Sequence, residues 1–308
     1  MKMELITFYL LHLFPFSDSD MAPLITIAEK LFYNIRGSFK IFGFIDIGTH
    51  ASLIRLKEPT ESDPSPHWAL IDSINFSDEQ VDEIRSLTND GRDIDVIINV
   101  HPFHTVYTPK SPALFPSAKL YGTERHKAKH PSLPWEPIPV ESAEFPQEFS
   151  KYSSDFEFSV PQGVDFVPTN ENIHFSSVLV YHKPTKTVFS DDTFGSMRLP
   201  YLATWLGYEQ HGVSLHPTLG SALQRRVGAA GEFRSWLTDL LERWDIQNLV
   251  AAHNSNFLAK HVEADPAKRS IKTRLLASLE SWEPTLQAHE EKAQQKAQQK
   301  AKEEERQE

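Results

Sequence analysis

The chain has 308 residues, of which 40 % are hydrophobic and 24 % charged, so a folded protein with a sizeable core is expected. The absence of cysteine excludes thiolate nucleophiles, iron–sulfur clusters and cysteine-based zinc fingers. A formal net charge of −11 argues against nucleic acid or an anionic membrane as partner, and no apolar run is long enough for a membrane span. Any metal must therefore be held by carboxylates and by some of the fourteen histidines.

The N-terminus is read as an extension over residues 1–22. Its first sixteen residues are mostly apolar, but they hold a single basic residue and no small-residue cleavage site, which disfavours a signal peptide. A polar joint follows, and Met21 is an alternative natural start. We expect a cytoplasmic protein, with a secretory leader based on the apolar residues 5–16 as the weaker alternative.

The first half of the main domain, residues 23–283, is predicted to be rich in strands. A continuous β-branched run at 94–100 is typical of a strand buried on both faces. Ser77 followed by acidic residues predicts the start of a helix, which the Asn-Asp-Gly sequence at 89–91 should end. Other predicted strands cover 39–47, 51–56, 68–72 and 118–122, and a proline-rich irregular stretch follows at 128–146.

The second half combines further strands with longer helices. Strands are predicted at 156–160, 164–167, 174–181, 187–190 and 246–252, with 174–181 and 187–190 forming a hairpin. Apolar residues at helical spacing predict helices at 231–243 and 270–282. The region 284–308 lacks an apolar seam, so we expect a charged low-complexity tail that is either a solvated helix or disordered.

Polar residues able to bind metal follow several of the predicted buried strands. His101 and His104 come after the strand at 94–100, Asp191 and Asp192 after 187–190, and His253 after 246–252, whereas His174 begins a strand. Functional groups in layered α/β proteins gather at such strand ends. Any one histidine after a strand is more often structural, and the Asp pair could be a simple turn, so only their joint placement indicates a site. The other histidines, including His50, His182 and His216, are taken as structural.

The order of these elements resembles the metallo-β-lactamase fold superfamily. The resemblance rests on Asp46-Ile47-Gly48-Thr49, Ala69 to Ser73, Val100 to Thr105, Asn172 to Ser177, Phe189 to Phe194 and Ala251-Ala252-His253, which together span about residues 30–260. It is closest to an uncharacterised branch with a His-Pro-Phe-His-Thr string. The resemblance implies a four-layer αββα sandwich that holds one or two zinc or iron ions and catalyses hydrolysis or oxygen reduction.

Matched to the superfamily's His-x-His-x-Asp-His string, this chain keeps only part of the motif. His101 matches the first histidine, and His104 replaces the second with a shift of one residue. Thr105 stands at the aspartate position and Val106 at the last histidine, so the second metal site is expected to be impaired. The resemblance implies the metal ligands His101, His104, His174, Asp192 and His253, with Asp192 matching the bridging aspartate better than Asp191.

Two functions remain open at this stage. In the first, the protein is a hydrolase with one zinc ion, or less typically iron or manganese, whose bound water attacks a carbonyl or phosphoryl centre of a small molecule. Asp192 and His253 would then be catalytic as well as ligating. In the second, it is a non-catalytic binding or scaffolding module whose metal is lost or structural. Four protein ligands would close a tetrahedral zinc site, whereas three would leave a position for water. A Ser-His-Asp enzyme is disfavoured because the chain has no Gly-x-Ser-x-Gly sequence.

Overall fold

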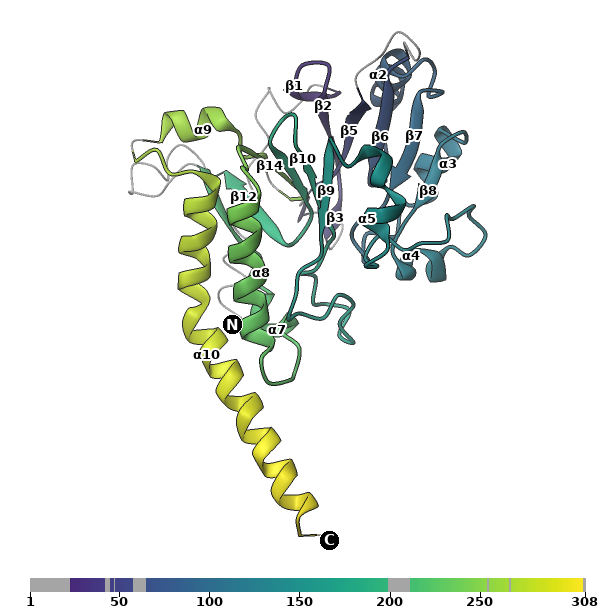
Figure 1. Cartoon of the computed structure of the whole chain (residues 1–308). Coiled ribbons are helices and arrows are strands. Elements are labelled where there is room, and N and C mark those ends of the chain that lie inside the picture. Colours follow the sequence, from purple (N-terminus) through teal and green to yellow (C-terminus); the bar gives the residue numbers. More distant parts are fainter. Residues whose placement is uncertain are drawn as a thin grey trace.

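A computed structural model describes residues 23–41, 45–46, 48–57, 65–198, 211–253, 255–265 and 267–306. The proposed N-terminal extension and its apolar residues 5–16 lie outside these ranges. Within them the chain forms two principal β-sheets that pack face to face, with helices on both outer sides (Figure 1). The α/β sandwich with αββα layers expected from the sequence is thereby confirmed.

The first sheet has six strands in the order β1-β2-β5-β6-β7-β8. The pairs from β1 to β6 are antiparallel, whereas β6, β7 and β8 run parallel to one another. Parallel neighbours need a crossover connection, and helix α2 (Asp78–Leu87) supplies the one between β6 and β7. The strands are Ile25–Ala28 (β1), Phe32–Gly37 (β2), Thr49–Lys57 (β5), His67–Ile71 (β6), Ile94–Ile98 (β7) and Lys119–Tyr121 (β8).

The second sheet has four strands in the order β14-β11-β10-β9. Strands β10 and β11 form the predicted antiparallel hairpin, and β11 pairs in parallel with β14. The strands are Phe156–Ser159 (β9), Leu179–His182 (β10), Thr187–Ser190 (β11) and Asn248–Ala251 (β14). Two small antiparallel pairs complete the strands, namely β3 (Lys40–Ile41) with β4 (Ile45–Asp46) and β12 (Phe194–Arg198) with β13 (His211–Leu215).

Three apolar clusters hold the layers together. The central one lies between the sheets and includes Phe32 and Ile98 from the first sheet and Phe189 from the second, all fully buried. A second cluster joins the first sheet to α2, through residues such as Ile84. The third joins the second sheet to α8 (Ala229–Arg243) and α10 (Ile271–Glu304), which cover its outer face in Figure 1. The sheets are therefore fixed on both faces, and their strand ends are held in place.

The remaining helices are short and lie at the edges of this sandwich. They are α3 (Lys110–Leu114), α4 (Glu124–Lys129), α5 (Phe145–Glu148), the 3₁₀ turn η2 (Ser150–Tyr152), α7 (Leu219–Ala222) and α9 (Ala259–Ala264).

Several predicted boundaries differ from the structure. The strand expected at 174–181 begins only at Leu179, so His174 lies in an irregular segment that precedes β10. The strand expected at 164–167 is reduced to one isolated bridge between Val164 and Leu223. Much of the strand expected at 39–47 falls on residues that the structure does not describe. At the N-terminus of α2, by contrast, Ser77 forms the predicted cap, and Gln80 completes a capping box.

The helix expected at 270–282 continues to Glu304 as the long projecting helix of Figure 1. It passes through Pro284, and the Leu286 side chain just beyond is fully buried against the α8 side of the molecule. The Glu290 carboxylate accepts a hydrogen bond from the Gly228 backbone N–H at the start of α8, at 2.7 Å. The first turns after Pro284 are thus packed against the domain, and the helix is exposed farther on.

His182 on β10 provides a test of the packing between the sheets. The residue is 1 % exposed, and the centroid of its ring lies 5.9 Å from that of Phe32 in the first sheet. Burial lowers the pKa of His182 to about 4. As the pH falls below about 6.5, His182 becomes protonated in the unfolded chain but stays neutral in the folded protein. The free energy of unfolding therefore decreases.

We expect the wild type to lose free energy of unfolding relative to His182→Gln by about 1.4 kcal/mol per pH unit between about pH 6.5 and 4. Urea denaturation at pH 7.0 and at pH 5.0, done side by side, measures this difference. Identical pH dependence of the two proteins would contradict it.

Candidate metal centre

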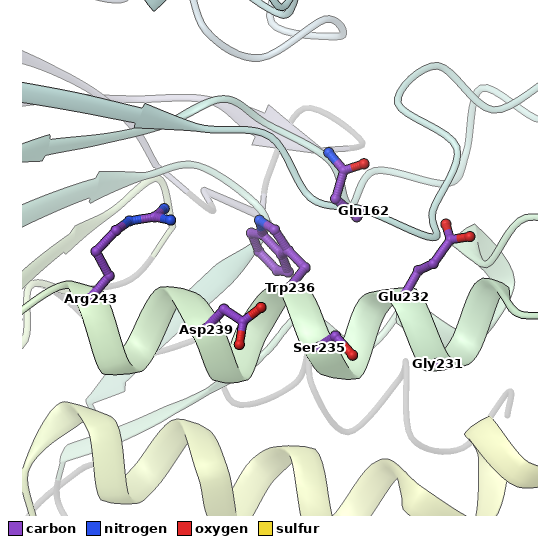
Figure 2. A pocket seen from close by; sticks show the side chains of 7 residues that line it. All are labelled: Gln162, Gly231, Glu232, Ser235, Trp236, Asp239 and Arg243. Carbon is purple, nitrogen blue, oxygen red and sulfur yellow. The ribbon is translucent and has the colours of Figure 1, made fainter.

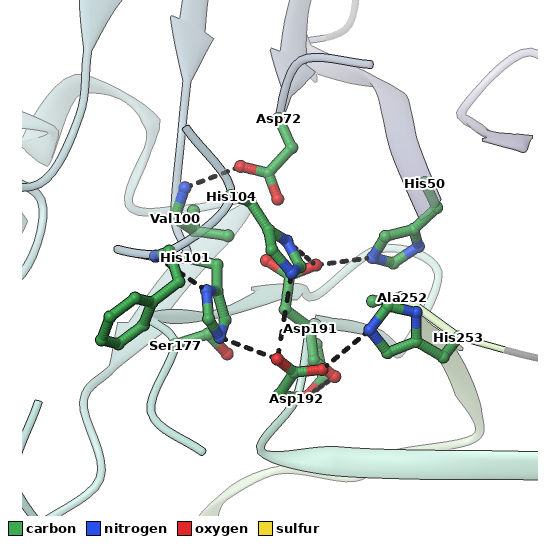
Figure 3. Close-up of polar contacts among 12 residues, drawn as sticks. His50, Asp72, Val100, His101, His104, Ser177, Asp191, Asp192, Ala252 and His253 are labelled. Atoms are coloured by element: carbon green, nitrogen blue, oxygen red, sulfur yellow. Dashed lines mark hydrogen bonds and ion pairs between the residues drawn. The ribbon is translucent and has the colours of Figure 1, made fainter. Parts of the chain in front are cut away.

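The candidate site lies where two pairs of parallel strands, one in each sheet, end side by side. Asp72 directly follows β6, and His101 follows its parallel neighbour β7. In the second sheet, Asp191 and Asp192 directly follow β11, and His253 follows the parallel strand β14. Because parallel strands bring their carboxyl ends to one edge, polar residues distant in the chain meet here (Figure 3).

Asp192 lies at the centre of the first group of side chains. Its Oδ2 atom is 3.0 Å from His101 Nε2, 3.9 Å from His104 Nε2 and 3.9 Å from His174 Nδ1. Its Oδ1 atom is 3.2 Å from His253 Nε2. The structure therefore brings together all five residues predicted as ligands, although their chemical roles remain predictions. Asp192 is 2 % exposed and His101 is fully buried, whereas the side chains of His104, His174 and His253 are 22 %, 40 % and 19 % exposed.

Hydrogen bonds to the backbone orient the rings of this group. His253 donates from Nδ1 to the Gly48 carbonyl (3.0 Å), and His174 donates from Nε2 to the Glu171 carbonyl (2.8 Å). In the neutral rings, the nitrogens that face Asp192 consequently carry a lone pair. His101 differs because its Nδ1 accepts from the Phe103 backbone N–H at 3.1 Å, so its neutral form carries the proton on Nε2, toward Asp192.

Asp191 is the centre of an adjoining second group. Its Oδ1 is 3.1 Å from His50 Nε2 and 3.5 Å from His104 Nδ1. The Asn34 amide nitrogen lies 3.2 Å from His50 Nδ1, and since an amide N–H only donates, Nε2 of the neutral His50 carries the proton and donates to Asp191. The carboxyl of Asp72 completes the group, and the close approach of Asp191 is one of the causes that raise the Asp72 pKa.

The backbone of Asp72 has an unusual conformation that aims its side chain at this group. Its φ is 61°, in the left-handed region that few residues other than glycine, asparagine and aspartate adopt. Its Oδ1 accepts a hydrogen bond from the Val100 backbone N–H at 2.8 Å (Figure 3). Asp72 therefore ties the end of β6 to the segment that carries His101.

Burial and contacts among these side chains shift the pKa values of the two groups in different directions. Burial raises the pKa of Asp72 well above its usual value and that of Asp191 to about 7. Burial would raise the Asp192 pKa as well, but the rings of His101 and His253 hold it well below its usual value. Burial lowers the pKa of His101 to about 3, whereas Asp192 outweighs burial at His253 and raises that pKa.

Sequence reasoning assigned His50 and His216 to structure and gave Asp72 no role. His50 lies at the start of β5, as its second residue, and β5 is antiparallel to β6, so His50 lies at the same edge as Asp72. That pairing is the signal that would have found both residues. His216 lies near Asp192, His174 and His253, and burial lowers its pKa to about 4. The sequence did not decide which of Asp191 and Asp192 is the metal ligand. In the structure, Asp192 lies at the centre of the first group and Asp191 at the centre of the second.

The residues fit a divalent cation. The ligand atoms of His101, His104 and Asp192 lie within 4.8 Å of one another, and so do those of Asp72, His104 and Asp191. Several buried atoms have close neighbours but lack the alignment of a hydrogen bond with any described residue, namely His101 Nε2, Asp72 Oδ2, Asp191 Oδ2 and both carboxylate oxygens of Asp192. Unsatisfied buried polar atoms that converge in this way are expected where a cation binds.

The departures from the His-x-His-x-Asp-His string lie outside both groups. Val106 is 67 % exposed, and the Thr105 carbonyl accepts a hydrogen bond from His130 at 2.8 Å. A separate pocket of about 610 Å³ runs along α8, lined by residues that include Trp236, Asp239 and Arg243 (Figure 2). None of the residues that line this pocket belongs to the histidine–aspartate groups.

Solved metallo-β-lactamases are similar to this chain over most of their length. The enzyme from Erythrobacter litoralis has 12 % identity and a TM-score of 0.48, covering 82 % of this chain and 95 % of its own. The FIM-1 enzyme of Pseudomonas aeruginosa in its mono-zinc form has 11 % identity and a TM-score of 0.47, covering 84 % and 96 %. The enzyme from Pontibacter korlensis has 11 % identity and a TM-score of 0.47, covering 83 % and 98 %.

No protein-family model and no curated protein matches the chain. The αββα assignment rests on the sheet order and the three apolar clusters described above. In the described part of the chain, no helix combines the length and the apolar character needed to cross a membrane.

Substitutions at Asp72 test its link to Val100. In protein freed of metal by EDTA, Asp72→Asn keeps the acceptor for Val100 and removes one of two adjacent carboxyls, so we expect it to be at least as stable as the wild type. Asp72→Ala loses the acceptor and places alanine at φ 61°, and we expect a loss of about 2–5 kcal/mol in urea denaturation.

Asp90→Ala is the matched control, because Asp90 has the same φ of 61° but is exposed. It should lose only about 1 kcal/mol. Equal losses for Asp72→Asn and Asp72→Ala would show that the contact with Val100 does not stabilise the fold.

Proposed function

We propose that the protein is a metal-dependent hydrolase, with zinc as the first candidate ion, that adds water to a carbonyl or phosphoryl centre of a small molecule. The observation that supports this proposal is the Asp192 carboxylate, which is buried, approached by four histidine rings and without an aligned hydrogen bond from any described residue. Imidazole nitrogens and a carboxylate are ligands that zinc accepts.

The ligands proposed for the ion surround the Oδ2 side of Asp192. His101, His104 and His174 approach this oxygen, and His253 approaches Oδ1 from the other side. A divalent cation held there supplies Lewis acidity to water and to the oxygen of the scissile group. Because the chain contains no cysteine, a zinc ion would have to be held by histidine and carboxylate ligands such as these.

The exposure of the rings gives the site a closed base and an accessible rim. His101 and Asp192 are buried, whereas the side chain of His174 is 40 % exposed and those of His104 and His253 about half as much. A substrate would therefore approach past His174. The His174 ring stacks on Phe103 at 4.7 Å, and the Arg125 guanidinium lies 4.6 Å from the Phe103 ring centroid. Arg125 is also paired with the Glu171 carboxylate at 2.7 Å, so its charge at this rim is compensated.

The tautomer of His101 affects how this ring could bind a cation. Its neutral ring carries the proton on Nε2, between the ring and Asp192, because Phe103 donates to Nδ1. A neutral imidazole binds a cation through its lone pair, so a cation between His101 and Asp192 would require the tautomer with the proton on Nδ1, in place of the contact from Phe103.

Metal content and turnover of Asp192→Asn test the proposal. We expect purified wild-type protein to bind zinc near stoichiometrically and to hydrolyse at least one member of a panel of aryl esters, thioesters, lactones and phosphodiesters. Removing the central carboxylate should weaken zinc binding at least about 100-fold and abolish that turnover. Elemental analysis, calorimetric titration with zinc and a chromogenic assay measure these effects.

Asp245→Asn serves as the control, because this aspartate is exposed and paired with Lys186 at the surface. It should bind zinc and turn over substrate as the wild type does. Wild-type protein that folds without binding zinc, and whose thermal stability zinc does not change, would overturn the proposal and favour a non-catalytic binding or scaffolding module.

A further inference from the structure

Two histidines of the α4 region contact the backbone of the segment that carries His104. His130 Nε2 lies 2.8 Å from the Thr105 carbonyl oxygen, and His126 Nε2 lies 3.4 Å from the His104 carbonyl oxygen. A carbonyl oxygen only accepts hydrogen bonds, so each Nε2 donates its proton. Residues four positions apart in a helix are neighbours on one face. The two rings therefore hold two consecutive carbonyls of the segment.

Thr123, the N-cap of α4, fixes the orientation of the His126 ring. The Thr123 backbone N–H donates to His126 Nδ1 at 3.3 Å, and the Thr123 hydroxyl lies 2.8 Å from the same nitrogen. His126 is fully buried, and burial lowers its pKa to about 3, so the ring is neutral. Because Nδ1 accepts, the single proton of this neutral ring is on Nε2, facing the His104 carbonyl.

The position of the His104 ring depends on its own backbone. Each of the other three histidines proposed as ligands forms a hydrogen bond between one ring nitrogen and a backbone group. The ring nitrogens of His104 face Asp191 and Asp192 instead, at 3.5 and 3.9 Å, and the ring stacks on His101 at 4.1 Å. Among the described residues, no backbone group forms a hydrogen bond with either of these nitrogens.

We propose that His130 and His126 are positioning residues, which hold the His104 ring in place between Asp191 and Asp192. The importance of this position rests on the proposed function, in which His104 is a metal ligand. Zinc–nitrogen bonds are only about 2.0–2.1 Å long, so a small shift of the His104 backbone would take its ring out of reach of the ion.

The α4 region is itself fixed to the first sheet, so it can serve as a rigid support. Trp135 Nε1 donates to the His130 carbonyl at 2.9 Å, and an isolated bridge joins Trp135 to Leu120 in β8. Gly122, which follows β8, allows a close approach, since a Cβ atom there would lie 2.6 Å from the Trp135 ring. The order of the sheet is thereby passed on through Trp135 to the end of α4.

Of the two contacts, the one from His130 is better suited to a test. The His104 carbonyl also accepts from Thr108 Oγ1 at 3.3 Å, which would partly replace His126. In the described part of the chain, the Thr105 carbonyl accepts from His130 alone. His130 is also half-buried, whereas His126 is fully buried and takes part in the N-terminal cap of α4.

Hydrogen–deuterium exchange of metal-free protein tests the contact itself. The amides of His104 and Thr105 donate to the His101 and Phe103 carbonyls, so their exchange reports opening of this segment. In EDTA-treated full-length protein, we expect His130→Leu to raise the exchange rate of these amides about fivefold. His130→Gln should stay close to the wild type, because its side-chain amide is able to donate to the same carbonyl.

Zinc affinity tests the consequence for the ligand. In a competition titration with a chelator, we expect His130→Leu to weaken zinc binding about 10- to 100-fold and His130→Gln to restore most of that loss. Thr88→Val is the matched control, because it removes a buried hydroxyl that donates to the Ile84 carbonyl at 2.6 Å. Thr88 contacts Asp93, just before β7, at the opposite end of that strand from His101. This control should match the wild type in both measurements.

The outcomes separate this inference from the proposed function. If the wild type binds zinc and His130→Leu changes neither zinc binding nor exchange, the inference is overturned and the proposed function stands. Equal losses for His130→Leu and His130→Gln would also overturn it, because the donated hydrogen bond would not be the cause. Wild-type protein that binds no zinc would overturn the proposed function, and the exchange rates would still decide whether His130 holds the segment of His104.

Discussion

Three buried aspartates at one edge of the sandwich are the constraint on which the rest of the site depends. Ionised carboxylates lose several kcal/mol of hydration when buried, and neutral histidines only partly replace it. The fold compensates Asp72 with the Val100 amide and Asp191 with His50, but Asp192 has close neighbours without aligned donors. An ionised Asp192 at this position is therefore costly, which is why the proposed function assigns a cation to it.

The packing of the two sheets explains why the carboxylates stay buried and close together. The ends of β6 and β7 belong to the first sheet and those of β11 and β14 to the second. Each sheet is packed on both faces, so these strand ends cannot move apart to let water solvate the carboxylates. The stability of the three apolar clusters thereby keeps the ligands close together.

The layered fold and five residues of the site could be predicted because both depend on patterns within short segments. A β-branched run such as 94–100 identifies a buried strand, and the residue after it is then placed at a sheet edge. His101, Asp192 and His253 follow from this rule. His174 was predicted to begin a strand, yet β10 begins only at Leu179. Its place in the site comes from the irregular segment that precedes the strand.

His50 and Asp72 could not be predicted in this way, because their proximity depends on how strands pair. His50 is the second residue of β5 and Asp72 directly follows β6, and only the antiparallel pairing of these strands brings the start of one beside the end of the other. The left-handed backbone of Asp72 is likewise invisible in composition, since aspartate in a turn has no single conformation. A sequence motif such as the His-x-His-x-Asp-His string describes only the potential ligands that lie in one segment of the chain. In this chain Thr105 and Val106 remove two ligands from the string, whereas Asp72 and Asp191 bring carboxylates to the same edge from two other strands. The degenerate string therefore does not prevent histidines and carboxylates from gathering at this edge of the sandwich.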